Sequence, residues 1–391
     1  MDYAVPRAFF REGMLGKLVT DLYFSSPLSV KLAVLHRYRS DIPGEFVVRN
    51  LGAGLAYRLL LRLRRGEASP HLFAAEALGR VTVKAIEDVS AKILYGFDTA
   101  LLPILARVDA LGCSVIMEQC IAPRMHLIKL IPSLAERVEK TGISSKESGL
   151  DVVLGYLELL AAIERAEWEQ ASLIVCPSRF VRDELLGLGV PEAKTIIIPY
   201  GVTVASNLVQ KRSPGGRGTK LKVAFVGTFS YRKGAVDYCQ LASRYDGRAE
   251  FHAFGSIMLP KPVMDKIAGS IIIRGHLSRD ALFRELSQFD VLILPSYSEG
   301  SATVVYECMA LGLVCIVSDA SGSVITSGLD GLIFEAGDDR GMFNAFEAVM
   351  SSPSFRCSMS EAAVETSKAF TRESYGARVV SSTKAFCKQL E

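Results

Sequence analysis

The sequence has 391 residues, which is the length of two or three average domains and enough to bury sizeable cores without disulfides or metals. Its composition, 49% hydrophobic and 22% charged, is that of a folded globular protein and excludes a disordered one. The net charge of +3 excludes a protein built mainly around nucleic-acid phosphates. Mean hydropathy is +0.26, but no run of about 18 uncharged apolar residues predicts a membrane-spanning helix.

Cysteine and histidine usage favours a reducing compartment and argues against a metal site. The eight cysteines form no Cys-x-x-Cys pair and lie mostly within apolar runs, so we interpret them as small buried hydrophobic residues. The five histidines show no ligand spacing with cysteines or carboxylates, so no metal ligands are predicted. The residues after Met1 lack the apolar stretch of a signal peptide, and the expected location is the cytoplasm.

The first half of the chain alternates between strand and helix patterns. The strand candidates are Leu18–Phe24, Glu45–Arg49, Cys113–Met117, Leu173–Pro177 and Thr195–Pro199. Helical patterns lie near Tyr3–Leu15, Leu55–Arg65, Pro70–Tyr95, Ala100–Leu111 and Val152–Gln170. The segment 203–220 contains SPGGRG and no apolar periodicity, which predicts a hinge linker after this α/β domain.

The second half shows the same alternation more clearly. Buried strands are predicted at Leu221–Gly227, Ala249–Gly255, Ser270–Gly275, Asp290–Pro295 and Val314–Ser318. Each strand is followed by turn residues and an amphipathic segment, and the tail after residue 370 is again helical. Near-continuous apolar strands alternating with helices predict a parallel sheet covered on both faces, where ligands bind beyond the carboxyl ends of the strands.

The strongest chemical pattern is DVLILPSYSEGSATVVYECMALG, residues 290–312. A buried strand leads into a loop that carries Glu299 and Gly300, and a helix begins near Thr303 with Glu307 in its second turn. The first amides of a helix and its dipole suit an anionic or hydroxyl-rich ligand. The two carboxylates can accept hydrogen bonds from vicinal hydroxyls of a sugar or ribose. The alternative for Glu307 is a solvated helix face, which its apolar neighbours disfavour.

A second pattern, VGTFSYRKG, follows a strand and precedes a helix at residues 226–234. Arg232 and Lys233 can donate hydrogen bonds to a diphosphate from this position. Gly227 lets the backbone approach a ligand closely, and Gly234 permits an unusual turn conformation. The alternative is a basic pair that only decorates an exposed turn.

These two patterns, with FHAFGS, IIIRGHLSRD and SGLDGLIFEAGD, resemble glycosyltransferase family 4, retaining enzymes of the GT-B fold that use nucleotide-sugar donors. The similarity spans roughly Leu159–Thr371. It implies an α/β, GT-B architecture of two Rossmann-like, doubly wound parallel-sheet domains facing across a cleft. The implied parts are an acceptor-side domain (residues 1–202), a linker (203–220), a donor domain (221–370) and a C-terminal helix that crosses back (371–391).

The resemblance also implies roles for individual residues. Lys233, with Arg232 beside it, would neutralise the donor diphosphate. Glu299 would contact the transferred sugar, and Glu307 would hold the ribose hydroxyls. The other implied donor-binding residues are Gly227, Thr228, Gly255, Gly275, His276, Leu277, Gly300, Ser301, Ala302 and Thr303. The chain departs from the family pattern at Thr228, where many relatives have Arg, and at residues 301–303, where they often have Phe-Gly-Leu.

The expected reaction is therefore sugar transfer from a nucleotide-diphosphate-sugar to a hydroxyl of a glycan or lipid-linked acceptor, as in polysaccharide or glycoconjugate synthesis. No Asp-x-Asp occurs in the chain, so no metal and no cofactor beyond the donor is expected. Two alternatives remain open: a nucleotide-sugar epimerase of the same fold, and a non-catalytic protein that binds nucleotide sugars.

The N-terminal half offers weaker patterns. The strand near residue 115 leads into a loop with Glu118, Arg124 and His126, which could touch the acceptor or sugar or be ordinary loop polarity. GT-B N-terminal domains commonly open with a strand and a glycine-containing loop, whereas this chain begins almost directly in a predicted helix, YAVPRAFFREGML. Either that strand is absent or the true start lies upstream.

The segment Arg49–Arg65 holds five arginines and no acidic residue. Arg58, Arg62 and Arg65 share one helical face beside several leucines. Such a face can rest on anionic lipid at the inner face of the membrane or hold a phosphorylated acceptor. The alternative is an ordinary amphipathic helix with a basic outer face.

Overall fold

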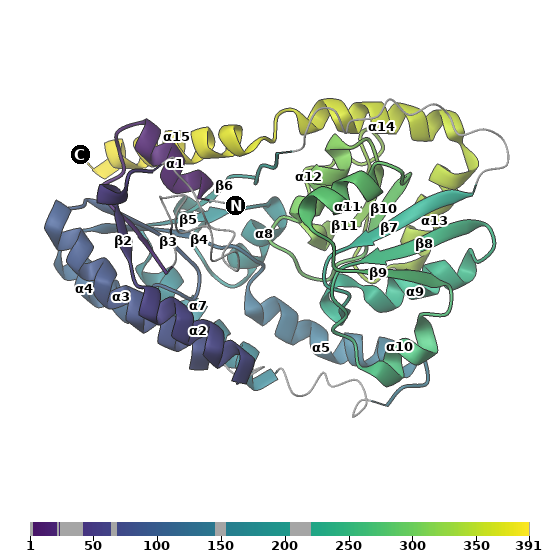
Figure 1. The fold of residues 1–391 in the computed structure, drawn as a ribbon, viewed down its shortest axis with the longest axis horizontal. Helices are drawn as coiled ribbons and strands as arrows, with labels where there is room; N and C mark the ends of the chain where they lie inside the picture. Colours follow the sequence, from purple (N-terminus) through teal and green to yellow (C-terminus); the bar gives the residue numbers. More distant parts are fainter. Residues whose placement is uncertain are drawn as a thin grey trace.

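The computed structural model describes residues 3–21, 23, 42–63, 69–144, 154–203 and 220–390, and Figure 1 shows two α/β domains side by side. The predicted linker falls almost entirely outside the described residues, as does Arg65. In the described part of the chain, no helix has both the length and the apolar character needed to cross a membrane.

The C-terminal domain is built on a six-stranded parallel sheet with the order β12-β11-β10-β7-β8-β9. Its strands are β7 (Leu221–Val226), β8 (Ala249–Phe254), β9 (Ile271–Gly275), β10 (Val291–Leu294), β11 (Val314–Ser318) and β12 (Leu332–Phe334). Its helices are α9 (Ala235–Arg244), α10 (Lys261–Ile267), α11 (Arg279–Leu286), α12 (Thr303–Ala310) and α13 (Asp339–Ser351). Every residue of β10 is 0% exposed, as expected for an inner strand with helices on both faces.

The N-terminal domain contains two parallel sheets, β3-β4-β5-β6 and the pair β1-β2. The strands are β1 (Leu18–Thr20), β2 (Val47–Arg49), β3 (Ile93–Phe97), β4 (Ser114–Glu118), β5 (Leu173–Cys176) and β6 (Thr195–Ile197). The helices are α1 (Ala4–Arg11), α2 (Leu51–Leu63), α3 (Ser69–Val89), α4 (Leu105–Ala110), α7 (Leu154–Gln170) and α8 (Arg179–Gly187).

Two further helical segments tie the domains together, as Figure 1 shows. Helix α5 (Arg124–Glu139) follows β4, yet its Leu134 and Val138 are buried in the hydrophobic core of the C-terminal domain. Helix α14 (Pro353–Ser367) leads into α15 (Arg372–Leu390), which buries Tyr375 and Val379 against the N-terminal sheet. Each domain therefore receives a helix from the other half of the sequence.

The α/β class with parallel sheets is confirmed, but several element predictions need correction. Helix α3 ends at Val89, and the last residues of the predicted helix Pro70–Tyr95 belong to strand β3 instead. Strand β1 is shorter than predicted and ends at Thr20. The first residues of α5, from Arg124 to His126, were predicted as part of a loop. Pro132 within the helix weakens the helical pattern of the sequence.

Candidate active site

The predicted donor-binding loops all follow the carboxyl ends of neighbouring strands in the C-terminal sheet. Gly227 follows β7, Gly255 follows β8, and Gly275 ends β9. The loop with Glu299 follows β10, which pairs with β7. Strands β8 and β9 lie on one side of β7, and β11 and β12 lie beyond β10 on the other. This is the topological switch point, where open α/β sheets bind their ligands.

Two basic side chains and one carboxylate meet at this point. Lys233 Nζ lies 2.7 Å from Glu299 Oε1, and Arg232 Nη1 lies 3.0 Å from the same oxygen. Arg232 Nη1 also donates a hydrogen bond to the carbonyl of Ser298. Since two cations share one carboxylate, the cluster carries a net positive charge that favours an anion.

Two glycines allow the loops beside this cluster to pack backbone against backbone. Gly227 and Gly255 have φ angles of +133° and +130°, which side chains rarely tolerate. A Cβ on Gly255 would lie 2.0 Å from the carbonyl oxygen of Gly227, and a Cβ on Gly227 would lie 3.2 Å from the Lys233 side chain. A side chain at either position would therefore disturb the cluster. Thr228, in the same loop, is half-buried.

Glu307 lies on α12 and forms an ion pair with Arg279, the first residue of α11. Burial raises the pKa of the Glu307 carboxyl, and the guanidinium of Arg279 opposes this shift. Arg279 follows the loop of His276 and Leu277, so the ion pair brings the end of that loop to Glu307. The sequence analysis missed Arg279. Its position directly after Ser278, whose side chain caps α11, is the signal that could have revealed it.

The start of α12 differs in detail from the prediction. The amide of Ala302 donates to the carbonyl of Ser321 at 3.1 Å, and its carbonyl accepts from the amide of Val305 at 2.9 Å. Both backbone groups of Ala302 therefore have protein partners in this conformation. The Ser301 hydroxyl lies 2.6 Å from the Tyr306 hydroxyl, and Thr303 opens the helix.

The loops of the two domains touch beside this site. A Cβ on Gly300 would lie 1.9 Å from the carbonyl oxygen of Cys120 in the loop after β4. The Ser178 hydroxyl, at the amino end of α8, donates to the carbonyl of Gly300 at 2.6 Å. Only glycine fits this approach, so Gly300 joins the N-terminal domain to the loop that carries Glu299.

His126 is the predicted N-terminal residue that reaches the C-terminal site. Its Nε2 donates to the carbonyl of Tyr297 at 3.0 Å, and its Nδ1 lies 2.9 Å from Glu184 Oε2. Both partners are acceptors, so the arrangement favours the doubly protonated ring. Burial alone would lower the pKa of His126, but the hydrogen bonds to Glu184 and Tyr297 raise it overall.

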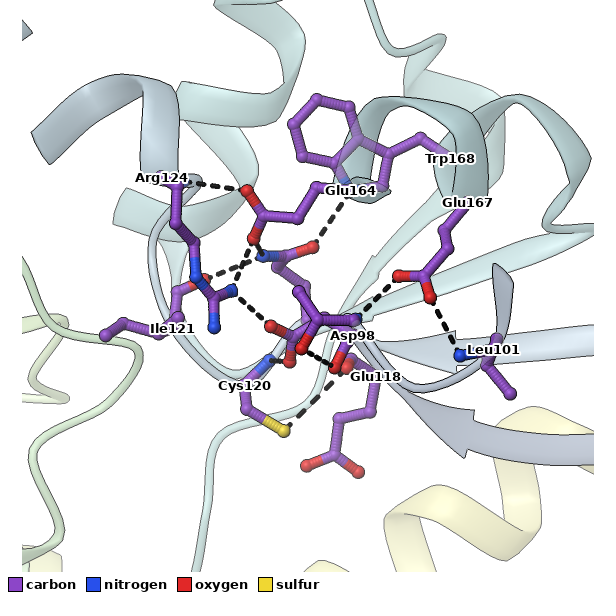
Figure 2. A network of polar contacts seen from close by, with 11 residues as sticks. Asp98, Leu101, Glu118, Cys120, Ile121, Arg124, Glu164, Glu167 and Trp168 are labelled. Carbon is purple, nitrogen blue, oxygen red and sulfur yellow. Dashed lines mark hydrogen bonds and ion pairs between the residues drawn. The ribbon is translucent and has the colours of Figure 1, made fainter. Parts of the chain in front are cut away.

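Glu118 and Arg124, the other two residues predicted to touch the acceptor or sugar, both have protein partners. Glu118 is 1% exposed and accepts hydrogen bonds from the hydroxyls of Tyr95 at 2.6 Å and Tyr375 at 2.8 Å. Figure 2 shows the Arg124 guanidinium directed at Asp98 and the carboxylate of α7. These contacts lie within the N-terminal domain, so both residues hold the loop after β4 in place.

Comparison with known proteins gives a family match within the C-terminal domain and solved structures of similar fold. Residues 220–352 match the family model described as Glycosyl transferases group 1. HepE from Anabaena, solved with UDP and glucose, superimposes with a TM-score of 0.63 at 13% identity over 98% of this chain and 95% of that one. Sucrose-phosphate synthase from Thermosynechococcus elongatus gives a TM-score of 0.59 at 16% identity over 81% and 79% of the two chains. No curated protein matches the sequence. The fold is GT-B.

In this GT-B fold the N-terminal domain also contributes residues that the sequence analysis missed. Arg137 on α5 pairs with Asp237 and Asp339 of the C-terminal domain. The Tyr297 hydroxyl donates to the same Asp237 at 3.0 Å. Burial raises the pKa of Asp237 to about 6, and Arg137 opposes the shift. These contacts fix the loop after β10 to α5.

Among the described residues, no group of three or more His, Cys, Asp or Glu side chains is placed to hold a metal ion.

Proposed function

We propose that this protein is a retaining, metal-independent glycosyltransferase that moves a hexose from a nucleotide-diphosphate-sugar to a hydroxyl of a glycan or lipid-linked acceptor, in cell-surface polysaccharide or glycoconjugate synthesis. The observation that carries the proposal is the Lys233–Glu299–Arg232 cluster at the switch point, inside the segment that matches the Glycosyl transferases group 1 model. The HepE structure with UDP and glucose has the same fold and supports a nucleotide-sugar donor.

The basic pair serves the leaving group. When the anomeric C–O bond breaks, negative charge grows on the diphosphate and the sugar gains oxocarbenium character. Lys233 and Arg232 are already held at one point by Glu299, so they need little reorganisation to stabilise that charge. The diphosphate replaces Glu299 as their partner, and the freed carboxylate accepts hydrogen bonds from sugar hydroxyls.

Glu307 holds the nucleoside. Its carboxylate uses one oxygen for Arg279, which leaves the second oxygen to accept a ribose hydroxyl. Arg279 is nearly half exposed, so it can shift as the ligand enters. The loop of Gly275, His276 and Leu277 then flanks the base.

The acceptor approaches from the N-terminal domain, beside His126 and Gly300. In a retaining reaction without an enzymic nucleophile, the acceptor hydroxyl attacks the face from which the diphosphate leaves. The new bond joins the acceptor oxygen to the anomeric carbon, and the hydroxyl proton passes to the departing phosphate oxygen. Metal ions have no part in this scheme, because the basic pair neutralises the diphosphate.

Nucleotide-dependent thermal shifts test the donor site first. UDP, GDP, ADP, CMP and dTDP are compared with and without EDTA. We expect one nucleoside diphosphate to raise Tm equally in both conditions, because ligands that bind the folded state stabilise it. A shift that disappears with EDTA contradicts metal independence, and the absence of any shift contradicts the donor site.

Product analysis then separates the alternatives. An epimerase converts the donor sugar nucleotide in the absence of any acceptor, whereas a glycosyltransferase needs an acceptor hydroxyl. A non-catalytic protein binds the nucleotide without turnover. We expect an acceptor-dependent release of nucleoside diphosphate and an α- or β-linkage that keeps the donor configuration.

Contact with an anionic membrane at its cytoplasmic face is also proposed, through α2. Four leucines spaced by four residues are exposed there: Leu51 at 40%, Leu55 at 60%, Leu59 at 57% and Leu63 at 72%. Arg58, which pairs with Asp21 at 3.1 Å, lies on the same helix, as does Arg62. Arg65, the third residue of the predicted basic face, lies outside the described residues. An apolar stripe beside basic residues is typical of interfacial helices.

Vesicle sedimentation tests this contact. The wild-type chain should sediment with phosphatidylglycerol vesicles and not with phosphatidylcholine vesicles. Leu55→Glu should weaken that binding several-fold, whereas Leu159→Glu, at a leucine of α7 that is 42% exposed, should not. Equal behaviour of the two variants contradicts the contact.

A further inference from the structure

Tyr297 connects the two loops that form the candidate donor site. It lies two residues before Glu299 in the loop after β10 and is 3% exposed. Its amide donates to the carbonyl of Arg232 at 2.8 Å, and its carbonyl accepts from His126 of α5 at 3.0 Å. Its hydroxyl donates to Asp237 of α9 at 3.0 Å. One buried residue therefore bonds to the turn of the basic pair, to α9 and to a helix from the N-terminal half.

The backbone bond of Tyr297 lies in a close contact between the two loops. Residues 231–233 form a 3₁₀ turn that ends at Gly234, which has a φ angle of +71° in the left-handed region. A Cβ on Gly234 would lie 2.0 Å from the carbonyl oxygen of Pro295, so the turn packs backbone against backbone on the start of the loop after β10. The distance of 2.7 Å from Lys233 Nζ to Glu299 Oε1 depends on how the two backbones are aligned there.

The phenol side chain attaches this contact to the rest of the domain. Its acceptor, Asp237, is 3% exposed and lies in the first turn of α9, which begins directly after Gly234. Arg137 Nε donates to the same oxygen of Asp237 at 2.9 Å, and Arg137 Nη1 donates to the carbonyl of Gly337 at 3.0 Å. Because Asp237 is buried and also binds Arg137, its carboxylate has a fixed direction. The hydroxyl of Tyr297 therefore gives the loop after β10 a fixed point of attachment.

We propose that Tyr297 is a positioning residue of the donor site, which holds the loop of Glu299 at a fixed distance from the turn of the basic pair. The proposal rests on the proposed function, since it takes the basic pair as the group that binds the donor diphosphate. The hydroxyl acts through Asp237 and the amide acts through Arg232, so the effect of Tyr297 on the diphosphate is indirect.

The hydroxyl is the part of Tyr297 whose role can be separated from packing. The ring lies in the hydrophobic core of the C-terminal domain, where a phenylalanine ring would fit equally well. Without the hydroxyl, the loop after β10 keeps its backbone bonds but loses its attachment to Asp237, so it can shift relative to the turn of the basic pair. The donors must then be ordered when the diphosphate binds, which weakens binding.

Tyr297→Phe removes that hydroxyl and keeps the ring. Tyr245→Phe is the matched control, because Tyr245 is also 3% exposed and its hydroxyl donates to the carbonyl of Phe343 at 3.4 Å. Tyr245 follows the carboxyl end of α9, whereas the turn of the basic pair precedes the amino end of that helix. Each substitution removes one buried donor, so we expect both to lower Tm by about 2–4 °C.

Hydrogen exchange and pyrophosphate titration are the readouts. Amide exchange in residues 231–234 should be about 10-fold faster in Tyr297→Phe than in the wild type, and unchanged in Tyr245→Phe. Inorganic pyrophosphate lacks a nucleoside, so its affinity depends on the basic pair. Its Kd, measured by isothermal titration, should rise by about 3- to 10-fold in Tyr297→Phe and stay constant in Tyr245→Phe.

Three results would overturn the role of Tyr297. Unchanged exchange in residues 231–234 would show that the hydroxyl does not hold the turn. Faster exchange with an unchanged Kd would show that the position of the turn does not affect binding, and equal effects of Tyr245→Phe would reflect a general loss of stability. A wild-type chain that binds no pyrophosphate would instead contradict the donor site of the proposed function, and the exchange measurement would still decide whether Tyr297 holds the two loops together.

Discussion

Two clusters of charged side chains lie beyond the carboxyl ends of the two sheets, and they differ in how their charges are satisfied. In the N-terminal cluster, the Glu164 carboxylate, which is 0% exposed, accepts from the amide of Arg124 at 2.8 Å and from Gln119 Nε2 at 2.7 Å as well as pairing with the guanidinium. Glu167 accepts three backbone amides within 2.9 Å. Figure 2 shows the donors that the Glu164 and Glu167 carboxylates already have.

The C-terminal cluster is open by comparison. Arg232 and Lys233 contact a single oxygen of Glu299, and Arg232 has one further partner, the carbonyl of Ser298. Cations that share one carboxylate and have few other partners can transfer to a diphosphate at low cost, whereas a buried and saturated pair cannot be opened without leaving a charge unpaired. The comparison therefore favours a structural role for the N-terminal cluster and agrees with the binding role proposed for the C-terminal cluster.

Arg124→Ala should produce the largest change, and it should be a loss of stability. The substitution leaves Asp98 and Glu164, with side chains 4% and 0% exposed, without their cation, which costs about 3–5 kcal/mol in buried pairs. Urea denaturation measures the free energy of unfolding. Arg248→Ala removes an exposed pair with Glu347 and should cost about 1 kcal/mol or less. Equal losses in the two variants would contradict a structural role for the N-terminal cluster.

Lys233→Ala should lower turnover and leave stability nearly unchanged, the converse of Arg124→Ala. Removing one donor to the leaving group lowers kcat by about 100- to 1000-fold, while the free energy of unfolding stays near that of the wild type. Initial rates of nucleoside diphosphate release provide the measurement. Lys261→Ala, at a lysine whose side chain is 86% exposed, is the matched control and should leave kcat unchanged. A normal kcat for Lys233→Ala would show that Lys233 does not stabilise the charge on the leaving group.

The sequence predicted the open cluster better than the saturated one, and the reason is distance along the chain. Lys233 and Glu299 each follow an apolar strand and precede a helix, so local spacing revealed both of them. Arg124 depends on partners 26 and 40 residues away, which no local pattern connects. The partners of Glu118 were missed for the same reason, because one of them, Tyr375, lies 257 residues further along the chain. Contacts formed by tertiary packing were the part that could not be predicted.

Strand β3 shows the same limit in the fold. The apolar run at Ile93–Phe97 follows helix α3 closely, so its pattern merged with that of the helix. The C-terminal strands, by contrast, are separated from their helices by glycine-rich turns. Even so, the sequence analysis predicted five of the six described strands in each half of the chain, since it missed β12 (Leu332–Phe334) as well as β3, and it predicted no strand order for either sheet.

Glu307→Ala should have a smaller effect, confined to binding. Loss of a hydrogen bond to a charged acceptor raises the Kd for the nucleoside diphosphate by about 10-fold or somewhat more. Isothermal titration with the nucleotide that shifts Tm measures it. Glu347→Ala, on the exposed face of α13, is the control. A change in Kd for Glu307→Ala would separate nucleotide binding from leaving-group stabilisation, because Lys233→Ala should act mainly on turnover. An unchanged Kd would remove Glu307 from the donor site.

The smallest predicted effect is a pH dependence of stability, caused by the contact of His126 between the two domains. The pKa of His126 lies above its ordinary value of about 6.5 in the folded chain, mainly because its hydrogen bonds to Glu184 and Tyr297 outweigh burial. The charged ring therefore stabilises the fold fully below pH 6.5, and this contribution is lost as the pH rises through the higher, folded-state pKa. Since Glu184 is partly exposed, solvent screening limits it to about 1 kcal/mol or less.

His126→Gln isolates that contribution, because glutamine keeps a donor but does not titrate. The Tm difference between wild type and His126→Gln should be largest near pH 6 and should shrink by pH 9. His71→Gln is the control of opposite sign, since burial lowers the pKa of His71 and its charged form opposes folding. A Tm difference that stays constant with pH would contradict a contribution of the charged imidazole to the contact with Glu184 and Tyr297. The contact between the domains would then resemble the saturated N-terminal cluster rather than the open one.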